Sequence, residues 1–135
     1  MASYLEMEYP RRILVIEDDE EVQALLKDEF SDEGCRVLQA VNGEEAKRLI
    51  EEGMFDLVIT DLRFPKGEGL DMLPMVKSRN PEIPVIVITA FGEAKTREEA
   101  FQRGADRFLS KPFRTKELKA AVQEAMQKRK GGSER

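Results

Sequence analysis

Acidic, hydroxyl and ammonium side chains stand directly after short apolar runs at four places in this chain of 135 residues. The residues concerned are Glu17 and Asp18, Asp61, Thr89 and Lys111. Carboxylate oxygens suit a divalent cation such as Mg²⁺, and an ammonium group suits the oxygens of a phosphoryl group. The combination therefore predicts phosphoryl chemistry at a metal site, provided that the fold brings these side chains together.

The apolar runs predict the strands of a parallel sheet that would position these residues. They cover residues 13–16, 57–60, 85–88 and 108–110, and residues 36–40 form a fifth strand. Amphipathic stretches with apolar residues three or four positions apart separate the strands and predict five helices. This alternation predicts a doubly wound α/β domain, in which helices cover both faces of the sheet. Ligand sites in such folds lie beyond the carboxyl ends of the strands, along one edge of the sheet.

Capping residues and prolines predict where the helices begin and end. Gly34 is expected to end the first helix, and Asn42 with Glu45 three residues later predicts the N-terminus of the second. Pro74 falls early in the third helix, where it bends or delays the first turn. The fourth helix, around residues 93–103, has few apolar residues, so we expect weak burial and a locally unstable element.

The composition is that of a soluble globular domain, with 41% apolar and 36% charged residues. A net charge of −5 and a pI near 5.0 argue against nucleic acid as a direct partner, because phosphate backbones need a basic surface. No run approaches the roughly 20 apolar residues of a membrane span. The single cysteine, Cys35, fits a reduced, cytoplasmic setting without an internal disulfide. Because the chain contains no histidine, any phosphohistidine donor has to be another protein.

One domain is expected over residues 11–128. Residues 1–10 are expected to form a flexible leader, in which no secretory signal is recognisable. Residues 129–135, which include two consecutive glycines, are expected to form a flexible tail. The basic run Lys128-Arg129-Lys130 is interpreted as the solvated end of the last helix, where cations interact favourably with the helix dipole.

Five short motifs follow one another along the chain: Ile13-Leu14-Val15-Ile16-Glu17-Asp18-Asp19-Glu20, Asp61-Leu62-Arg63-Phe64-Pro65 with Gly69, Ile88-Thr89-Ala90, Gly104-Ala105, and Lys111-Pro112-Phe113. In this order and at these spacings they resemble the receiver domain of bacterial two-component response regulators. The resemblance spans roughly residues 11–128, nearly the whole chain. It implies a flavodoxin-like fold with strand order 2-1-3-4-5 and a crevice between the first and third strands.

The resemblance implies that Asp61 is the phosphate acceptor and that Glu17 and Asp18 bind Mg²⁺ together with it. The backbone carbonyl of Arg63 would complete the protein ligands. Electrostatics supports a cation here, since two carboxylates ~4 Å apart repel by roughly 4 kcal/mol at an effective dielectric constant of about 20. Oxygen ligands without a neighbouring histidine or cysteine favour Mg²⁺ over zinc. Asp19 is interpreted as an acid at the start of a helix rather than as a ligand.

By the same resemblance, Lys111 and Thr89 would contact the phosphoryl group, the lysine by its charge and the threonine by its hydroxyl. Thr89 would then move inward and leave room for Phe108, which stands at the position of the family's switch aromatic. The alternative for Phe108 is a plain core ring. Arg63 and Phe91 stand where the family tunes the rate at which water hydrolyses the acyl phosphate.

The resemblance implies a signalling domain rather than an enzyme with a separate substrate. A sensor histidine kinase or a phosphotransfer protein would donate the phosphoryl group. The chemistry of the chain itself would be limited to Mg²⁺-dependent self-phosphorylation and autodephosphorylation. Output would pass through the surface of the fourth helix, the fifth strand and the fifth helix, and a homodimer would form through the same surface. The kinase, the pathway and any output domain beyond residue 130 are not readable from this sequence.

Two other functions fit parts of the pattern. The first is a protein-interaction module with the same fold that works without phosphorylation, although every matched site position is filled. The second is a metal-dependent phosphatase of another α/β family with Asp61 as its nucleophile. Such enzymes usually carry a second acid two residues later, where this chain has Arg63.

Overall fold

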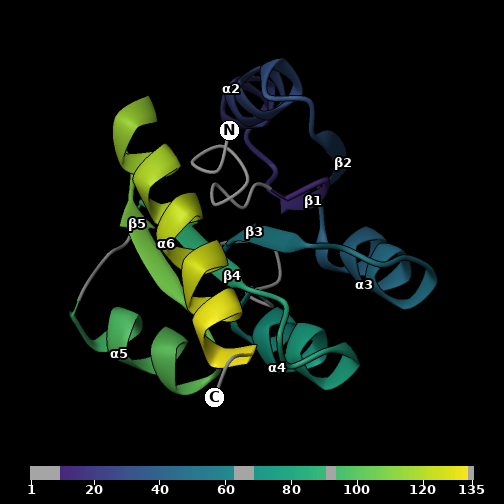
Figure 1. The fold of residues 1–135 in the computed structure, drawn as a ribbon, viewed down its shortest axis with the longest axis vertical. Coiled ribbons are helices and arrows are strands. Elements are labelled where there is room, and N and C mark those ends of the chain that lie inside the picture. Colours follow the sequence, from purple (N-terminus) through teal and green to yellow (C-terminus); the bar gives the residue numbers. More distant parts are fainter. Residues whose placement is uncertain (1–9, 63–68, 91–93, 134–135) are drawn as a thin grey trace.

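The computed structural model describes residues 10–62, 69–90 and 94–133. Five strands and five helices alternate along these residues, as predicted (Figure 1). In chain order the elements are β1 Arg12–Ile16, α2 Glu20–Asp32, β2 Arg36–Ala40, α3 Gly43–Glu52, β3 Leu57–Asp61, α4 Gly69–Arg79, β4 Val85–Thr89, α5 Ala94–Gln102, β5 Arg107–Ser110 and α6 Thr115–Ser133. The strands form one parallel sheet in the order β2-β1-β3-β4-β5, which confirms the predicted fold class and strand order.

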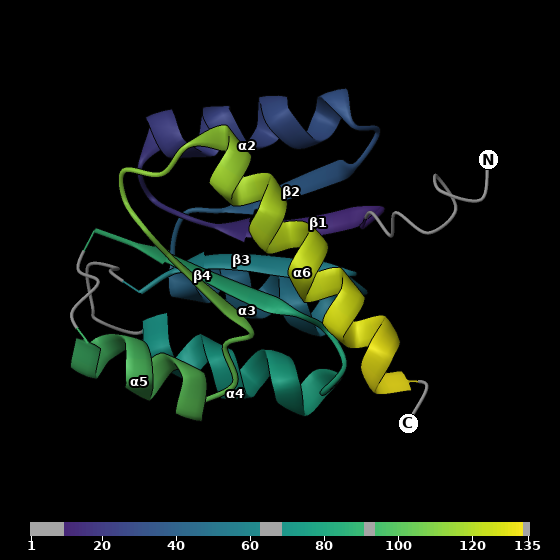
Figure 2. The ribbon, with the colours of Figure 1, turned by 60° about the vertical axis from the view of Figure 1, so that its left-hand side comes forward.

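Helices cover both faces of the sheet. The helices α2 and α6 pack on one face, and α3, α4 and α5 pack on the other (Figure 2). Successive residues of β1 point to opposite faces: Ile13 and Val15 lie in the core under α2 and α6, and Leu14 and Ile16 lie in the core under the other three helices. Each face therefore has its own apolar core, which explains why the inner strands are apolar at nearly every position.

The inner strands end in buried polar residues. Every residue of β3 and β4 is buried, whereas β2 and β5 at the edges of the sheet contain mostly half-buried residues. Thr60, Asp61 and Thr89 are among the few buried polar side chains of the described residues. Buried polar side chains are normally hydrogen-bonded. We therefore expect these three residues to be held in place by neighbouring groups.

The predicted capping residues mark the helix ends as expected. Asn42 accepts a hydrogen bond from the backbone N–H of Glu45 at 2.8 Å, and the Glu45 side chain accepts one from the backbone N–H of Val41 at 3.2 Å. Gly34 follows the end of α2 with a φ of 85°, a left-handed conformation that favours glycine. These local signals in the sequence are therefore confirmed.

The last helix is longer than predicted. We expected a tail from residue 129, but α6 continues to Ser133. Gly131 and Gly132 cost about 1 kcal/mol each relative to alanine in a helix, which weakens the last turn without ending it. The predicted leader lies outside the described residues except for Pro10. Neither α6 nor any other helix of the described ranges is long and apolar enough to cross a membrane.

Candidate functional site

The carboxyl ends of four strands meet at one edge of the sheet. The register of β1 with β3, of β3 with β4 and of β4 with β5 makes these strands end close to the same level. The residues at or just after these ends are Glu17, Asp61, Thr89 and Lys111. The fold thus brings together the polar residues that the sequence places after separate apolar runs, as parallel pairing requires.

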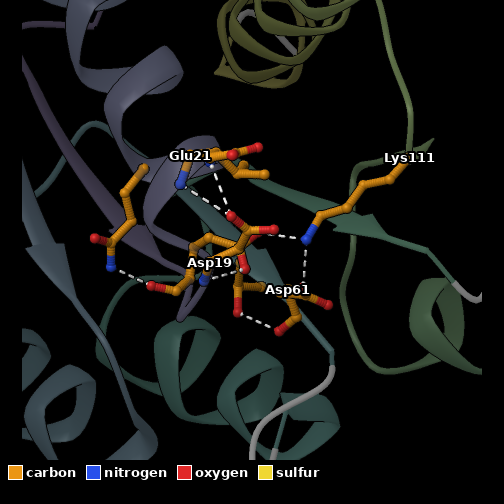
Figure 3. A network of polar contacts seen from close by, with 8 residues as sticks. Asp19, Glu21, Asp61 and Lys111 are labelled. Atoms are coloured by element: carbon orange, nitrogen blue, oxygen red, sulfur yellow. Dashed lines mark hydrogen bonds and ion pairs between the residues drawn. The ribbon is translucent and has the colours of Figure 1, made fainter.

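Lys111 connects two of the acids. Its Nζ atom lies 2.8 Å from Asp61 Oδ2 and 2.7 Å from Glu17 Oε1, and Figure 3 shows the lysine reaching across from β5 toward Asp61. Burial by itself lowers the pKa of the Lys111 ammonium, but the hydrogen bonds and charges of Asp61 and Glu17 outweigh this and raise the pKa above its ordinary value. Lys111 is therefore a fixed positive charge at the strand ends.

Glu17 is completely buried, although it is a carboxylic acid. Burial raises its pKa to about 7; the charge of Asp61 adds to this rise, while the bonds from Lys111 and from the backbone N–H of Asp19 oppose it. The second oxygen of Glu17 accepts that Asp19 N–H at 3.1 Å. With its pKa near 7, the Glu17 carboxyl is charged in only part of the molecules at neutral pH, and a further positive charge nearby would favour the charged form. The surroundings of Glu17 thus favour the arrival of a cation.

Glu17, Asp18 and Asp61 form a cluster that could hold a metal ion. One carboxylate oxygen from each lies within 4.8 Å of the others, and Asp18 is the exposed member of the three. The donor set contains oxygen only, which suits Mg²⁺ or Ca²⁺ better than zinc. Asp19 caps α2 instead, because its side chain accepts the backbone N–H of Glu21 at 2.9 Å (Figure 3). The interpretation of Asp19 as a helix-start acid is confirmed.

Thr89 is the last residue of β4 and lies at the carboxyl edge of the sheet. It is completely buried, and its backbone carbonyl accepts the N–H of Lys111 at 2.8 Å. The peptide bond after Lys111 is cis, to Pro112. The hydroxyl of Thr89 and the ammonium of Lys111 therefore come from neighbouring strand ends. The backbone contact between Thr89 and Lys111 fixes how these two strand ends lie next to each other.

Comparisons with known proteins identify the family of this chain. Residues 13–123 match the family model of the response regulator receiver domain. The chain belongs to this family. The receiver domain is 34% identical over 119 residues to the response regulator protein PilR of Pseudomonas aeruginosa, a match that covers 88% of this chain and 27% of PilR. The chain spans between about a quarter and a half of the length of the curated relatives it matches.

Solved structures resemble this receiver domain over most of its length. The beryllofluoride-activated NtrC4 receiver domain dimer is 30% identical with a TM-score of 0.82, and the match covers 88% of this chain and 98% of that one. A response regulator protein from Burkholderia pseudomallei, solved with a phosphorylated aspartic acid, a calcium ion and citrate, is 27% identical with a TM-score of 0.80. That match covers 91% of this chain and 72% of the other.

Phe108 of this receiver domain lies on β5, beside α5. It is half-buried, and its ring centroid lies 6.4 Å from that of Phe101. The guanidinium carbon of Arg97 lies 5.8 Å from the Phe101 centroid and 6.0 Å from the Phe108 centroid, which is within reach of cation–π attraction. A pocket between α5, β5 and α6 is lined by these three side chains among others. The ring of Phe108 thus lies at the edge strand of the sheet, half-buried, and packs against the core under α3, α4 and α5.

Two residues that were predicted for the site cannot be placed, and two residues that were not predicted make contacts near it. Arg63 and Phe91 of the receiver domain lie outside the described residues. Gln23 was not predicted to contribute, yet its side chain donates a hydrogen bond to the backbone carbonyl of Glu17. Arg97 was not predicted either, because an arginine on a polar helix face has no distinctive spacing. Contacts of this kind depend on which helix and strand become neighbours, and no local pattern marks them.

Proposed function

We propose that this receiver domain accepts a phosphoryl group on Asp61 from the phosphohistidine of a sensor histidine kinase or of a phosphotransfer protein. The observation that carries the proposal is the contact of one ammonium, that of Lys111, with both Asp61 and Glu17 at the carboxyl edge of the sheet. This arrangement provides a nucleophilic carboxylate, a fixed positive charge and neighbouring oxygen ligands at one place.

The transfer itself needs little covalent help from the protein. A carboxylate oxygen of Asp61 forms a bond to phosphorus while the bond between phosphorus and the donor imidazole nitrogen breaks, and the electron pair leaves with that nitrogen. The Lys111 ammonium and the Thr89 hydroxyl bind the phosphoryl oxygens and stabilise their charge. Water later hydrolyses the acyl phosphate, at a rate that Arg63 and Phe91 tune. On this view the chain is a phosphoacceptor and not an enzyme with a separate substrate.

The same proposal includes Mg²⁺. Glu17, Asp18 and Asp61 would hold the ion, and the backbone carbonyl of Arg63 would add a fourth ligand. When bound, Mg²⁺ supplies positive charge next to the phosphoryl oxygens and helps to orient them. The three acids fit this role because their oxygens lie within 4.8 Å of one another and because Glu17 is buried with a raised pKa. The structure of the relative from Burkholderia pseudomallei, which contains a phosphorylated aspartic acid and a calcium ion, supports both the acceptor and a divalent cation in this family.

Output is proposed to pass through the surface formed by α5, β5 and α6, which we call the output surface. The inward movement of the Thr89 hydroxyl toward the phosphoryl group would let Phe108 rotate from its half-buried position, and this would repack the output surface. The output surface is also the proposed homodimer interface. The NtrC4 receiver domain dimer supports dimer formation as such within the family. We expect the protein to act in the cytoplasm, where the kinase domains of its partners lie.

Incubation with Mg²⁺ and acetyl phosphate tests this function by intact mass spectrometry. The wild-type protein should gain the mass of one phosphoryl group, and Asp61→Asn should gain none. The alternative, an interaction module that works without phosphorylation, predicts no mass gain and a partner affinity that Asp61→Asn leaves unchanged. A wild-type protein that stays unmodified under these conditions would contradict the proposal.

A further inference from the structure

Hydrogen bonds hold the backbone of Glu17 and Asp18, which we call the acid pair. Gln23, near the start of α2, donates a side-chain N–H to the backbone carbonyl of Glu17. Glu17 also donates its own backbone N–H to the carbonyl of Ala40 at 3.0 Å. Gln39 of β2 donates its side-chain N–H to the backbone carbonyl of Gln23 at 2.9 Å. Both backbone polar atoms of Glu17 are therefore engaged, and the helix that carries Gln23 is tied to the neighbouring strand.

The hydrogen bond from Gln23 to the Glu17 carbonyl also affects Asp18, the residue after Glu17. The carbonyl of Glu17 belongs to the peptide group that joins Glu17 to Asp18, and this group is planar. A hydrogen bond to its oxygen fixes the rotation of the whole plane, and with it the direction in which the Asp18 side chain leaves the backbone. Within the described part of the chain, no hydrogen bond or ion pair holds the exposed Asp18 carboxylate itself. Its direction is thus determined through the backbone.

We propose that Gln23 is a positioning residue for the acid pair. Its side-chain N–H holds the peptide between Glu17 and Asp18 in the orientation that allows Asp18 to share a cation with Glu17 and Asp61. This inference rests on the Mg²⁺ site of the proposed function. Gln23 does not touch the cation; it acts through the backbone, as outer partners of metal ligands do, and loss of such partners typically weakens metal affinity by about 10–100-fold.

Two substitutions at Gln23 test the role. Gln23→Met keeps the size of the side chain and removes the donor, so the Mg²⁺ dissociation constant measured by calorimetry should rise about tenfold. In the same variant, the NMR resonance of the Glu17 carbonyl carbon should shift even without Mg²⁺, because it loses its hydrogen bond. Gln23→Glu also removes the donor but adds a negative charge near the site. A purely electrostatic effect would tighten Mg²⁺ binding in this variant, whereas loss of the anchor weakens it in both.

Gln39→Met is the matched control. It removes the same kind of bond, from a glutamine side chain to a backbone carbonyl, and ties α2 less firmly to β2 without touching the donor to Glu17. We expect a similar loss of thermal stability and a Mg²⁺ affinity within about twofold of wild type. Equal weakening by Gln39→Met and Gln23→Met would overturn the inference, since general loosening of α2 would then explain both.

The outcomes separate this inference from the proposed function. If wild-type protein binds Mg²⁺ and becomes phosphorylated while Gln23→Met and Gln23→Glu bind Mg²⁺ as tightly as wild type, only the positioning role is wrong. If the wild-type protein itself binds no Mg²⁺, the proposed function fails and the positioning role fails with it. Weaker Mg²⁺ binding in both Gln23 variants, with Gln39→Met unaffected, supports the role.

Discussion

Glu17 is the residue at which burial and the proposed function conflict most directly. A charged carboxylate in a dry environment is destabilising, and Asp61 adds a second negative charge nearby. Lys111 compensates for only part of this cost, since the pKa of Glu17 remains raised, to about 7. The buried charge of Glu17 therefore destabilises the metal-free protein, and a bound cation would reduce this destabilisation. Such a site gains function at the expense of stability.

Replacement of Glu17 by glutamine should stabilise the metal-free protein. The amide has nearly the same shape and carries no charge. Its single oxygen can keep only one of the two contacts of the carboxylate, with Asp19 N–H or with Lys111, and Lys111 keeps its ion pair with Asp61. At pH 8 with a chelator present, the free energy of unfolding of Glu17→Gln should exceed that of wild type by on the order of 1–2 kcal/mol. Urea denaturation monitored by circular dichroism measures this difference. Addition of Mg²⁺ should stabilise wild type and leave the variant almost unchanged.

The difference in the free energy of unfolding between Glu17→Gln and wild type should grow as the pH rises. The pKa of Glu17 is about 7 in the folded protein and 4.5 in its ordinary state, so between these values the folded protein binds more protons than the unfolded chain. The stability of metal-free wild type should therefore fall as pH rises from about 4.5 to about 7. Glu17→Gln lacks this contribution, and its advantage should shrink at pH 5. A constant advantage from pH 5 to pH 8 would contradict the account.

At the scale of elements, an ion pair joins α4 to the amino ends of β4 and β5, at the end of the sheet opposite the site. Lys77 of α4 lies 2.8 Å from Asp106, which precedes β5, and it also donates to the backbone carbonyl of Ile83 at 2.7 Å. Asp106 in turn accepts the backbone N–H of Val85, the first residue of β4, at 2.8 Å. One carboxylate thus joins a helix and two strands, and the pair is largely shielded from solvent.

Removal of this carboxylate should destabilise the domain without affecting the site. Asp106→Ala leaves the Lys77 ammonium and the Val85 N–H without that partner, so we expect a loss of about 2–3 kcal/mol in the free energy of unfolding. Arg48→Ala, which breaks an exposed ion pair with Glu52, serves as the control and should cost under about 0.5 kcal/mol. Phosphorylation by acetyl phosphate should be retained in both. Equal costs for the two substitutions would refute the assigned role of Asp106.

The helix α5 has the weak burial that its composition predicts. Ala100 is the buried residue of this helix, and Phe101 is 39% exposed. Few apolar contacts hold α5 to the sheet, so local opening should cost less there than in α6, which buries Leu118, Val122 and Ala125. The expected local instability of α5 stays a prediction.

At the scale of the whole molecule, the output surface combines apolar and charged side chains. Phe101 projects from α5 beside Phe108, and Arg107 of β5 pairs with Glu124 of α6 at 3.2 Å. An exposed ring next to charges of both signs suits a surface that meets a second copy of itself, because each copy supplies both partners of an ion pair. Phosphorylation would strengthen such a contact by repacking Phe108.

Dimer formation should follow activation and depend on Phe101. With Mg²⁺ and beryllofluoride, which stands in for the phosphoryl group, wild-type protein should sediment as a dimer in analytical ultracentrifugation. Phe101→Asp places a charge in the apolar part of the interface and should keep the protein monomeric. Leu25→Asp, at a comparably exposed apolar residue of α2, is the matched control and should still dimerise. Dimers of Phe101→Asp would show that another surface is used.

The sequence by itself determined the elements, their order and the residues that end the strands. Burial on both faces requires apolar residues at successive strand positions, and an amphipathic helix requires them three or four positions apart, so both patterns are visible locally. Asn42, Asp19 and Gly34 could be assigned for the same reason, because their bonds or torsion angles lie within a few residues. The resemblance to the receiver family added the strand order and the roles of the acids.

Only the tertiary structure decided which side chains meet. Lys111 lies between Glu17 and Asp61 because parallel strands in register bring their carboxyl ends to one level, a result that no segment encodes alone. Gln23 reaches Glu17 because α2 folds back over the strand that precedes it. The exposure of Phe101 likewise depends on how α5 packs against β5. Local periodicity specifies which face of an element is buried, whereas contacts between elements follow from the packing of the whole chain.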